Sequence, residues 1–394
     1  MVTGYSRLSA RQARAVLAIL ALGTVFCVEV ALSPLWQGNV ERSRRGAGDV
    51  ALYRAQVDRM QNGEGYYQAV FAEQTARGYP TRSVFNWRTP LPLWLIGRLP
   101  QVEWAKYFLG VLSLGLIVFA FEAMVGEKGN SFAAALGCVV LLSGPLLFTL
   151  LDDLFVMPVL WAGVLIAFSL CAYGTDRPGL GLGLGLSALF MSELALPYCL
   201  LCTGMAWWKY VLWKQLYIKG DSQIFTDHAS MAPEKLGQFP RELVAWGLGL
   251  CAWLIFFAWH WWNVSGLIGP DAIAHKHGWI RFGGAGFVLA TAQMNAYLIL
   301  LPPWVTALYF AAAMFGLAGW HTALGVRMGL TTCLYVTFFA VVGQDFNQYW
   351  GSIIAPLLCF GVIRFPASMR DLCQAADISA GKRRKFHARY ECRD

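Results

Sequence analysis

Apolar runs of about 20 residues recur along the chain and alternate with shorter polar segments. About 20 apolar residues are enough for one helix to cross a bilayer. Because segments of alternating polarity are lacking, we expect helical spans, which satisfy their own backbone hydrogen bonds inside the membrane. The clear runs cover about residues 14–33, 104–125, 131–151, 154–173, 243–262, 303–320, 322–342 and 349–364. The pattern predicts an all-α polytopic membrane protein.

Two further apolar stretches depart from this simple pattern. Residues 179–213 have the pattern of a helical hairpin broken near "SELALP" (192–197), which brings the expected total to about ten transmembrane helices. Residues 285–301 are ambiguous, and we interpret them as an interfacial or re-entrant helix. A span there would place the basic C-terminal tail on the outer side, against the positive-inside rule.

Composition and charge agree with this assignment and orient the chain. Hydrophobic residues make up 57% of the sequence and charged residues 14%, whereas soluble domains carry roughly a quarter charged residues. With the N-terminus in the cytoplasm, the short inner loops and the tail hold most lysines and arginines, as the positive-inside rule requires. We therefore expect an integral protein of a bacterial inner membrane, or of the endoplasmic reticulum membrane, with both termini on the cytoplasmic side. The basic tail favours contact with anionic lipid and gives no reason to expect nucleic acid.

We expect a single transmembrane domain over residues 1–366, followed by a basic tail over 367–394. Residues 34–103 form its first periplasmic or luminal loop, with amphipathic helices, and 263–301 form an outer loop with the interfacial helix. Acidic and basic residues gather on this outer side, and ionisable groups at the membrane edge indicate a functional site.

Five outer motifs occur in order along the chain. They are "GDVALY" (48–53), "VFNWRTPLPLWL" (84–95), "LLDDLF" (150–155), the broken hairpin (179–201) and "GQDFNQYWGSIIAPLLCFG" (343–361). In this order and on this side, the motifs resemble the GT-C superfamily, integral-membrane glycosyltransferases that use a polyprenyl- or dolichyl-phosphate sugar. The resemblance covers most of the chain. One departure is that Ser192 and Glu193 stand where relatives often carry lysine.

The resemblance implies that Asp49 is the general base. A lipid phosphate leaves readily as an anion, whereas the acceptor hydroxyl needs a base to take its proton. Asp49 opens an amphipathic helix (50–61) whose oily face, with Leu52, Val57 and Met60, could lie on the membrane surface. The alternative is that Asp49 is a helix N-cap, for which aspartate is favoured.

The donor phosphate requires cations, and two outer segments supply them. The candidates are Arg88, His275, Lys276, His277 and Arg281. Guanidinium groups match phosphate oxygens well, and glycines near 281 let the backbone approach an anion. The alternative for 275–284 is an interfacial loop that contacts lipid head groups and is anchored by Trp279.

Further polar residues on the outer side are candidates for binding the acceptor or the sugar. They are Tyr53, Asp152, Asp153, Glu193, Asp345, Gln348 and Tyr349. Asp152 and Asp153 could hold Mg²⁺ or Mn²⁺ through carboxylate oxygens. Since no spaced third ligand accompanies them, we favour an acceptor-orienting or structural role and expect no required cofactor.

The predicted function is inverting transfer of a sugar from a polyprenyl-phosphate donor to a hydroxyl of a glycolipid or glycan acceptor. Mannose is the favoured sugar only because many relatives use it. A multi-span transporter is the main alternative, because broken helices often form transport sites. Against it, the two halves show no internal repeat and few ionisable residues fall at mid-membrane. A catalytically inactive GT-C-like subunit is the second alternative.

Overall fold

The computed structural model describes residues 3–33, 48–127, 131–219, 238–274 and 281–377. Within these ranges every regular element is a helix and no strand occurs. The chain divides into two compact units, each made of several segments. Unit 1 comprises residues 1–47, 113–151 and 279–394, and unit 2 comprises residues 48–112 and 152–278. The expectation of one domain over residues 1–366 stays a prediction.

Five helices of the described residues are long and apolar enough to cross a membrane. They are α1 (Ala10–Leu32), α6 (Trp104–Gly126), α7 (Phe132–Leu146) with its extension to Thr149, α13 (Gln238–Ser265) and α16 (Ala323–Val341). A sixth span results if η7 (Asp345–Ile353) and α17 (Ala355–Ala375), bent by 58° at their junction, count as one. The structure thus confirms an all-helical chain with five or six potential spans, and the total of about ten stays a prediction.

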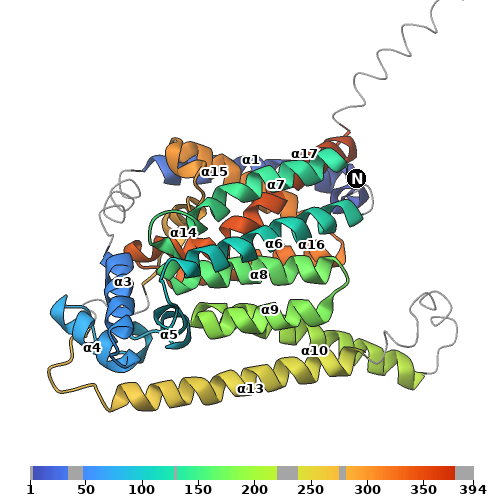
Figure 1. Ribbon diagram of the computed structural model, residues 1–394. Helices are drawn as coiled ribbons and strands as arrows, with labels where there is room; N and C mark the ends of the chain where they lie inside the picture. Colours follow the sequence, from blue (N-terminus) through green and yellow to red (C-terminus); the bar gives the residue numbers. More distant parts are fainter. Residues whose placement is uncertain (1–2, 34–47, 128–130, 220–237, 275–280, 378–394) are drawn as a thin grey trace, which may run out of the picture. The chain divides into compact units, whose positions relative to one another are not determined.

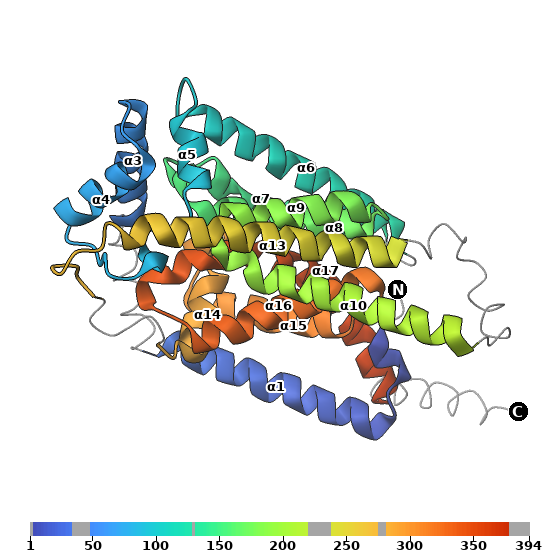
Figure 2. The ribbon, with the colours of Figure 1, turned by 90° about the horizontal axis from the view of Figure 1, so that it is seen from below.

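Unit 2 is built around three neighbouring pairs of apolar helices. α8 (Pro158–Gly174) packs on α9 (Pro178–Met191), while α13 packs on both α9 and α10 (Leu196–Lys219) (Figures 1 and 2). The predicted break in the hairpin is present between α9 and α10. It consists of extended Ser192 followed by the short turn η5 (Glu193–Ala195).

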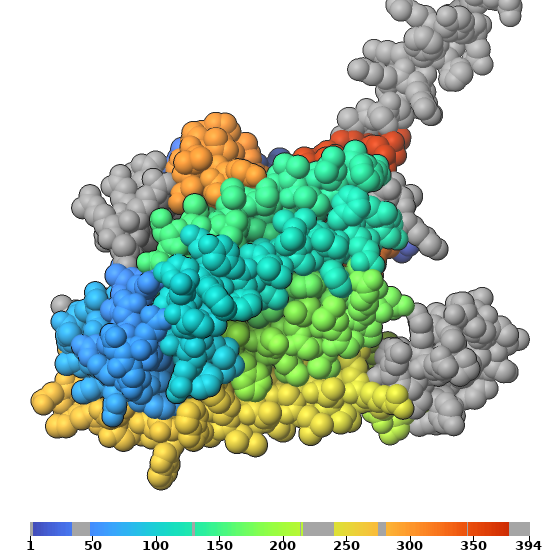
Figure 3. All heavy atoms as spheres, viewed as in Figure 1, coloured from blue at the N-terminus to red at the C-terminus, as the bar shows by residue number. Residues whose placement is uncertain are grey.

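Three short helices complete unit 2 before the apolar bundle. They are α3 (Gly48–Gln61), α4 (Tyr66–Ala76) and α5 (Leu91–Gly97), with the turn η2 (Val84–Asn86) ahead of α5. In the space-filling view, α3 and α4 in blue form one surface with the end of α13 in yellow (Figure 3). Tyr67 of α4 makes this contact, because its ring stacks on His260 and its hydroxyl lies 3.2 Å from His260 Nδ1.

The oily face of α3 packs against protein. Leu52 and Val57 are buried, and α3 contacts α4, α5 and the turn η4 (Leu154–Val156). Half-buried Met60 lies against Gly97 of α5, where an added Cβ would come within 2.9 Å of the Met60 Cβ. The expectation that this face lies on the membrane surface is therefore wrong for Leu52 and Val57, since an apolar stripe is buried equally well by protein or by lipid.

Unit 1 has α15 (Pro303–Ala318) and α17 at its centre. Glycines allow this close packing: a Cβ on Gly316 would collide with the carbonyl of Gly361, and one on Gly361 with the carbonyl of Ala313. α1 lies along α15 (Figure 2). The ambiguous stretch 285–301 contains α14 (Gly284–Ala292) and the turn η6 (Leu298–Leu300). α14 has nine residues, fewer than a span needs, and its interfacial placement stays a prediction.

The start of the chain folds against the end of α17 within unit 1. The Thr3 backbone N–H donates to Asp371 Oδ2 at 2.7 Å, and the Tyr5 hydroxyl donates to the Phe315 carbonyl at 3.1 Å. Arg14 Nε donates to the carbonyl of Ala376 at 3.2 Å. Residues at the two ends of the described chain are therefore in direct contact.

Candidate functional site

Five polar side chains of unit 2 form the strongest candidate site. Asp49 and Tyr53 come from α3, Tyr79 from the end of α4, Arg88 from the loop before α5, and Glu193 from the break between α9 and α10. We call these residues the Asp49 cluster. Four segments of the chain thus supply it, and three of its five members, Tyr53, Arg88 and Glu193, are predicted from sequence as ligands of the donor or acceptor.

Asp49 lies within the first turn of α3. It is the second residue of the helix and is partly exposed, so it is inside the helix and not at the position before it. A carboxylate in the first turn interacts favourably with the positive end of the helix dipole. Its Oδ1 accepts a hydrogen bond from the Tyr79 hydroxyl at 3.1 Å. The N-cap alternative is therefore not supported, and the base role stays a prediction.

Arg88 links α3 to the broken hairpin. Its Nε donates to the Tyr53 hydroxyl at 3.0 Å, and its Nη1 donates to Glu193 Oε1 at 2.9 Å. The side chains of both ion-pair partners are 13% exposed, so water screens this pair less than it screens surface pairs. The expected phosphate ligand thus already has a carboxylate partner, a pairing that sequence could not reveal across 105 residues.

The backbone of Arg88 has an unusual conformation. Its φ of +54° lies in the left-handed region, which costs a non-glycine residue on the order of 1–3 kcal/mol and persists only where the surrounding structure determines it. The buried Tyr66 hydroxyl donates to the carbonyls of Trp87 at 2.5 Å and Arg88 at 3.2 Å. These bonds hold the loop in the conformation that directs Arg88 toward Glu193.

Tyr53 is buried beneath Arg88, with 4% of its surface exposed. Burial raises the pKa of its phenol, and Arg88 only partly offsets this effect. Tyr53 is therefore neutral at physiological pH and can offer its own proton to a hydrogen-bond acceptor. The predicted acceptor-binding role of Tyr53 stays a prediction.

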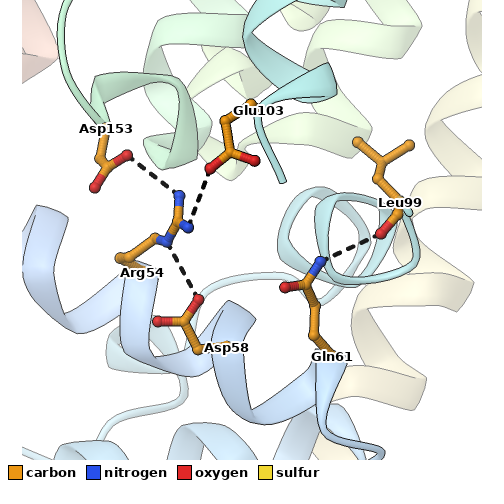
Figure 4. A network of polar contacts seen from close by, with 6 residues as sticks. All are labelled: Arg54, Asp58, Gln61, Leu99, Glu103 and Asp153. Atoms are coloured by element: carbon orange, nitrogen blue, oxygen red, sulfur yellow. Dashed lines mark hydrogen bonds and ion pairs between the residues drawn. The ribbon is translucent and has the colours of Figure 1, made fainter. Parts of the chain in front are cut away.

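A second group of charges surrounds Arg54, one residue after Tyr53 (Figure 4). Arg54 bonds Asp58 through Nε at 3.2 Å, Glu103 through Nη2 at 3.3 Å and Asp153 through Nη1 at 3.2 Å. Asp153 is thus tied to α3, while Asp152 is exposed with a φ of +39°. Within the described ranges, no group of three or more His, Cys, Asp or Glu residues could hold a metal ion. The ion pair with Arg54 supports the structural alternative for Asp153. Its role in orienting the acceptor stays a prediction.

The histidine-rich loop begins beside the segment that carries Arg88. The backbone N–H groups of Thr81 and Arg82 both donate to the carbonyl of Ile273, at 2.9 and 3.1 Å. His275, Lys276 and His277 themselves lie outside the described residues. Their phosphate-binding role stays a prediction.

The remaining predicted residues belong to unit 1. The Arg281 carbonyl accepts a hydrogen bond from the Gly343 N–H at 2.8 Å. Asp345 opens η7, and half-buried Gln348 and Tyr349 follow in the same turn. These four residues are neighbours within unit 1, and their part in a site with Asp49 stays a prediction.

Sequence reasoning missed two members of the polar network, Tyr79 and Arg54. A signal for Tyr79 exists in "RGYP" (77–80), because glycine followed by proline marks the end of a helix. Arg54 gave no such signal, since arginine on a polar helix face is ordinary. The chain matches no family model, no curated protein and no solved structure.

Proposed function

We propose that this chain is a GT-C-like membrane glycosyltransferase of about ten spans, with Asp49 as its general base. The observation that carries the proposal is the Asp49 cluster, in which a partly exposed carboxylate accepts a hydrogen bond from Tyr79 and lies near the bonded group of Tyr53, Arg88 and Glu193. Its position in the first segment after the first expected span fits a substrate that is held by the membrane.

The proposed reaction is a single displacement at the anomeric carbon. As the acceptor oxygen attacks C1 of the sugar, Asp49 takes the hydroxyl proton and the bond from C1 to the phosphate oxygen breaks. The polyprenyl phosphate leaves with the electron pair of that bond, so it needs cations more than a proton donor. The product has inverted configuration because no covalent enzyme intermediate forms.

The roles of the other residues follow from their charges. Cations of the 275–277 loop and Arg281 are proposed to bind the donor phosphate. Arg88 is proposed to contribute less to phosphate binding than sequence suggested, because Glu193 already neutralises it. The acceptor is proposed to be a hydroxyl of a glycolipid or glycan, and the sugar a mannose-like hexose. Their proposed contacts remain Tyr53, Asp152, Asp345, Gln348 and Tyr349.

The decisive experiment compares purified wild-type protein with Asp49→Asn, using radiolabelled polyprenyl-phosphate sugars and a membrane-lipid extract. A general base contributes roughly a hundred- to ten-thousandfold to the rate, so Asp49→Asn should reduce transfer at least a hundredfold. Asp58→Asn is the matched control, because Asp58 is an exposed carboxylate of the same helix. Equal transfer by the wild type and Asp49→Asn would remove Asp49 from the mechanism.

A transporter is the second candidate, and the interrupted helices favour it. The break at Ser192 in unit 2 and the 58° bend before α17 in unit 1 both leave helix ends where transported substrates often bind. Uptake of labelled sugars or lipid-linked sugars into proteoliposomes, without transfer to an acceptor, would support this alternative. An inactive GT-C-like subunit would show neither activity.

A further inference from the structure

The end of α4 fixes the backbone of Tyr79. The Gly78 N–H donates to the Thr75 carbonyl at 3.1 Å, and the Tyr79 N–H donates to the Gln74 carbonyl at 2.9 Å. Gly78 has a φ of +67°, so these bonds complete a Schellman motif, in which a left-handed glycine reverses the chain after a helix. Pro80 follows and prevents the helix from continuing. Tyr79 therefore leaves the helix in one defined direction.

The side chain of Tyr79 reaches the first turn of α3 and fits there closely. Its hydroxyl donates to Asp49 Oδ1 at 3.1 Å. A Cβ added to Gly48 would lie 2.6 Å from the Tyr79 hydroxyl oxygen but 3.9 Å from the ring carbon that bears it. The absence of a side chain at position 48 thus leaves the space that this hydroxyl occupies, a steric observation that adds to the hydrogen bond.

The hydroxyl of Tyr79 stays protonated and therefore remains a hydrogen-bond donor. Burial, followed by the nearby Asp49 carboxylate, raises the pKa of the Tyr79 phenol above its ordinary value of 10.0. A neutral hydroxyl can orient a carboxylate without cancelling its charge, whereas a lysine or arginine in the same place would form an ion pair with it. A base must keep its charge and its direction to take a proton during attack.

We infer that Tyr79 is a positioning residue that holds the Asp49 carboxylate in the orientation needed for proton abstraction, with Gly48 providing the space for its hydroxyl. This inference rests on the proposed transferase function. It assigns the "RGYP" segment a role in catalysis, although Tyr79 itself does not touch the reacting atoms.

The test is a double-mutant cycle of Tyr79→Phe and Gly48→Ala in the full-length protein, with Asp49→Asn as reference. Tyr79→Phe should lower kcat about tenfold and leave the KM for the donor unchanged, because orientation affects the chemical step. Gly48→Ala should cause a similar loss in the wild-type background, because its methyl group displaces the hydroxyl. In the Tyr79→Phe background the same substitution should cost less than twofold, because the atom it meets is gone.

Gly65→Ala is the matched control, since its new Cβ would meet only Gln68 Oε1 at an ordinary 3.6 Å. If Asp49→Asn is inactive while Tyr79→Phe keeps the wild-type kcat, the positioning role is overturned and the transferase stands. If wild-type protein transfers no sugar, the proposed function and this inference fall together. If Asp49→Asn transfers sugar at the wild-type rate, Asp49 is not the base, so this inference falls while the transferase activity stands.

Thermal unfolding supplies a readout that does not depend on activity. Gly48→Ala should lower the unfolding temperature in the wild-type background and leave it unchanged or higher in the Tyr79→Phe background, where alanine only favours the helix. An equal shift in both backgrounds would show that the hydroxyl does not lie against Gly48, and would overturn the inference whatever the kinetics show.

Discussion

Arg88 is the residue on which three separate parts of unit 2 depend. Its side chain bonds Tyr53 of α3 and Glu193 of the hairpin break, and its carbonyl accepts a bond from Tyr66 of α4. A strained backbone persists only where the surroundings determine it. The left-handed φ of Arg88 is therefore evidence that these contacts are strong enough to fix the loop.

Glu193→Gln should destabilise the protein, because it removes the carboxylate that pairs with the guanidinium of Arg88 at 2.9 Å. Hydrogen bonds to charged groups contribute about 1.5–3 kcal/mol, and we expect a loss of that order in unfolding experiments in detergent. The double variant Arg88→Gln/Glu193→Gln should lose less than the sum of the two single variants. Strict additivity would mean that the two side chains do not interact.

The residue scale also shows why sequence located part of the site. Asp49, Arg88 and Glu193 are predicted from sequence because ionisable groups gather at the membrane edge, because guanidinium matches phosphate, and because the motif order resembles the GT-C superfamily. Their pairing could not be predicted, since it depends on how α3 and the broken hairpin pack. Tyr79 was missed because tyrosine is common near membranes, and only the geometry of the α4 end distinguishes it.

The α3–α4 hairpin is stabilised by two ion pairs that meet at Glu73. Glu73 Oε1 accepts from Arg59 Nε at 2.6 Å, and its Oε2 accepts from Arg77 Nε at 3.0 Å. The hydrogen bond from Arg59, together with that from Arg77 and against the effect of burial, holds the pKa of Glu73 below its ordinary value of 4.5. Glu73 therefore stabilises the fold in its charged form.

This shift predicts a pH dependence with a definite sign. Because the folded pKa is lowered, the contribution of Glu73 is present above about pH 4.5 and is lost as the pH falls through the folded value. Glu73→Gln should lower the unfolding temperature at pH 7, and the difference from wild type should shrink as the pH falls below 4.5. A difference that stays constant from pH 7 to pH 3 would contradict the ion-pair explanation. Glu64→Gln, in a more exposed pair with Arg59, should have a smaller effect.

The close packing of α15 on α17 leads to a second prediction at the scale of helices. Gly361→Ala should destabilise unit 1 by about 1–3 kcal/mol, the usual cost of overpacking, because its methyl group would collide with the Ala313 carbonyl. Gly23→Ala in α1 is the control. Its Cβ would meet nothing within 4 Å, and alanine should stabilise the helix by up to about 1 kcal/mol. Loss of stability in both variants would rule out close packing as the cause.

Sequence predicted the long elements well and their surroundings less well. The starts of α1, α6 and α7 lie within about four residues of the expected spans, because length and apolar character are local properties. The partner of the apolar face of α3 was assigned wrongly, since hydrophobic periodicity does not distinguish protein from lipid. α8 and α9, between residues 158 and 191, are shorter than the usual span. Whether each of them crosses a membrane depends on tertiary packing, which the local sequence does not encode.

At the scale of the whole chain, the contact between its two ends limits the number of membrane crossings. Thr3 bonds Asp371, and Arg14 bonds the Ala376 carbonyl, so these residues occupy the same side of any membrane that the chain crosses. An odd number of crossings would put them on opposite sides. The contact therefore predicts an even number of crossings, such as six, eight or ten.

We predict that the N- and C-termini share one side, and we expect it to be the cytoplasmic side because basic residues gather near both ends. Green fluorescent protein fused to either terminus should fluoresce, and alkaline phosphatase fused at either terminus should be inactive. Asp371→Ala in each fusion tests the contact separately: the variant should lower the unfolding temperature without changing either reporter, because orientation is set by charge during insertion. Reporters that place the two termini on opposite sides would contradict the 2.7 Å bond between Thr3 and Asp371 and the packing of the turn η1 (Gly4–Arg7) against α17.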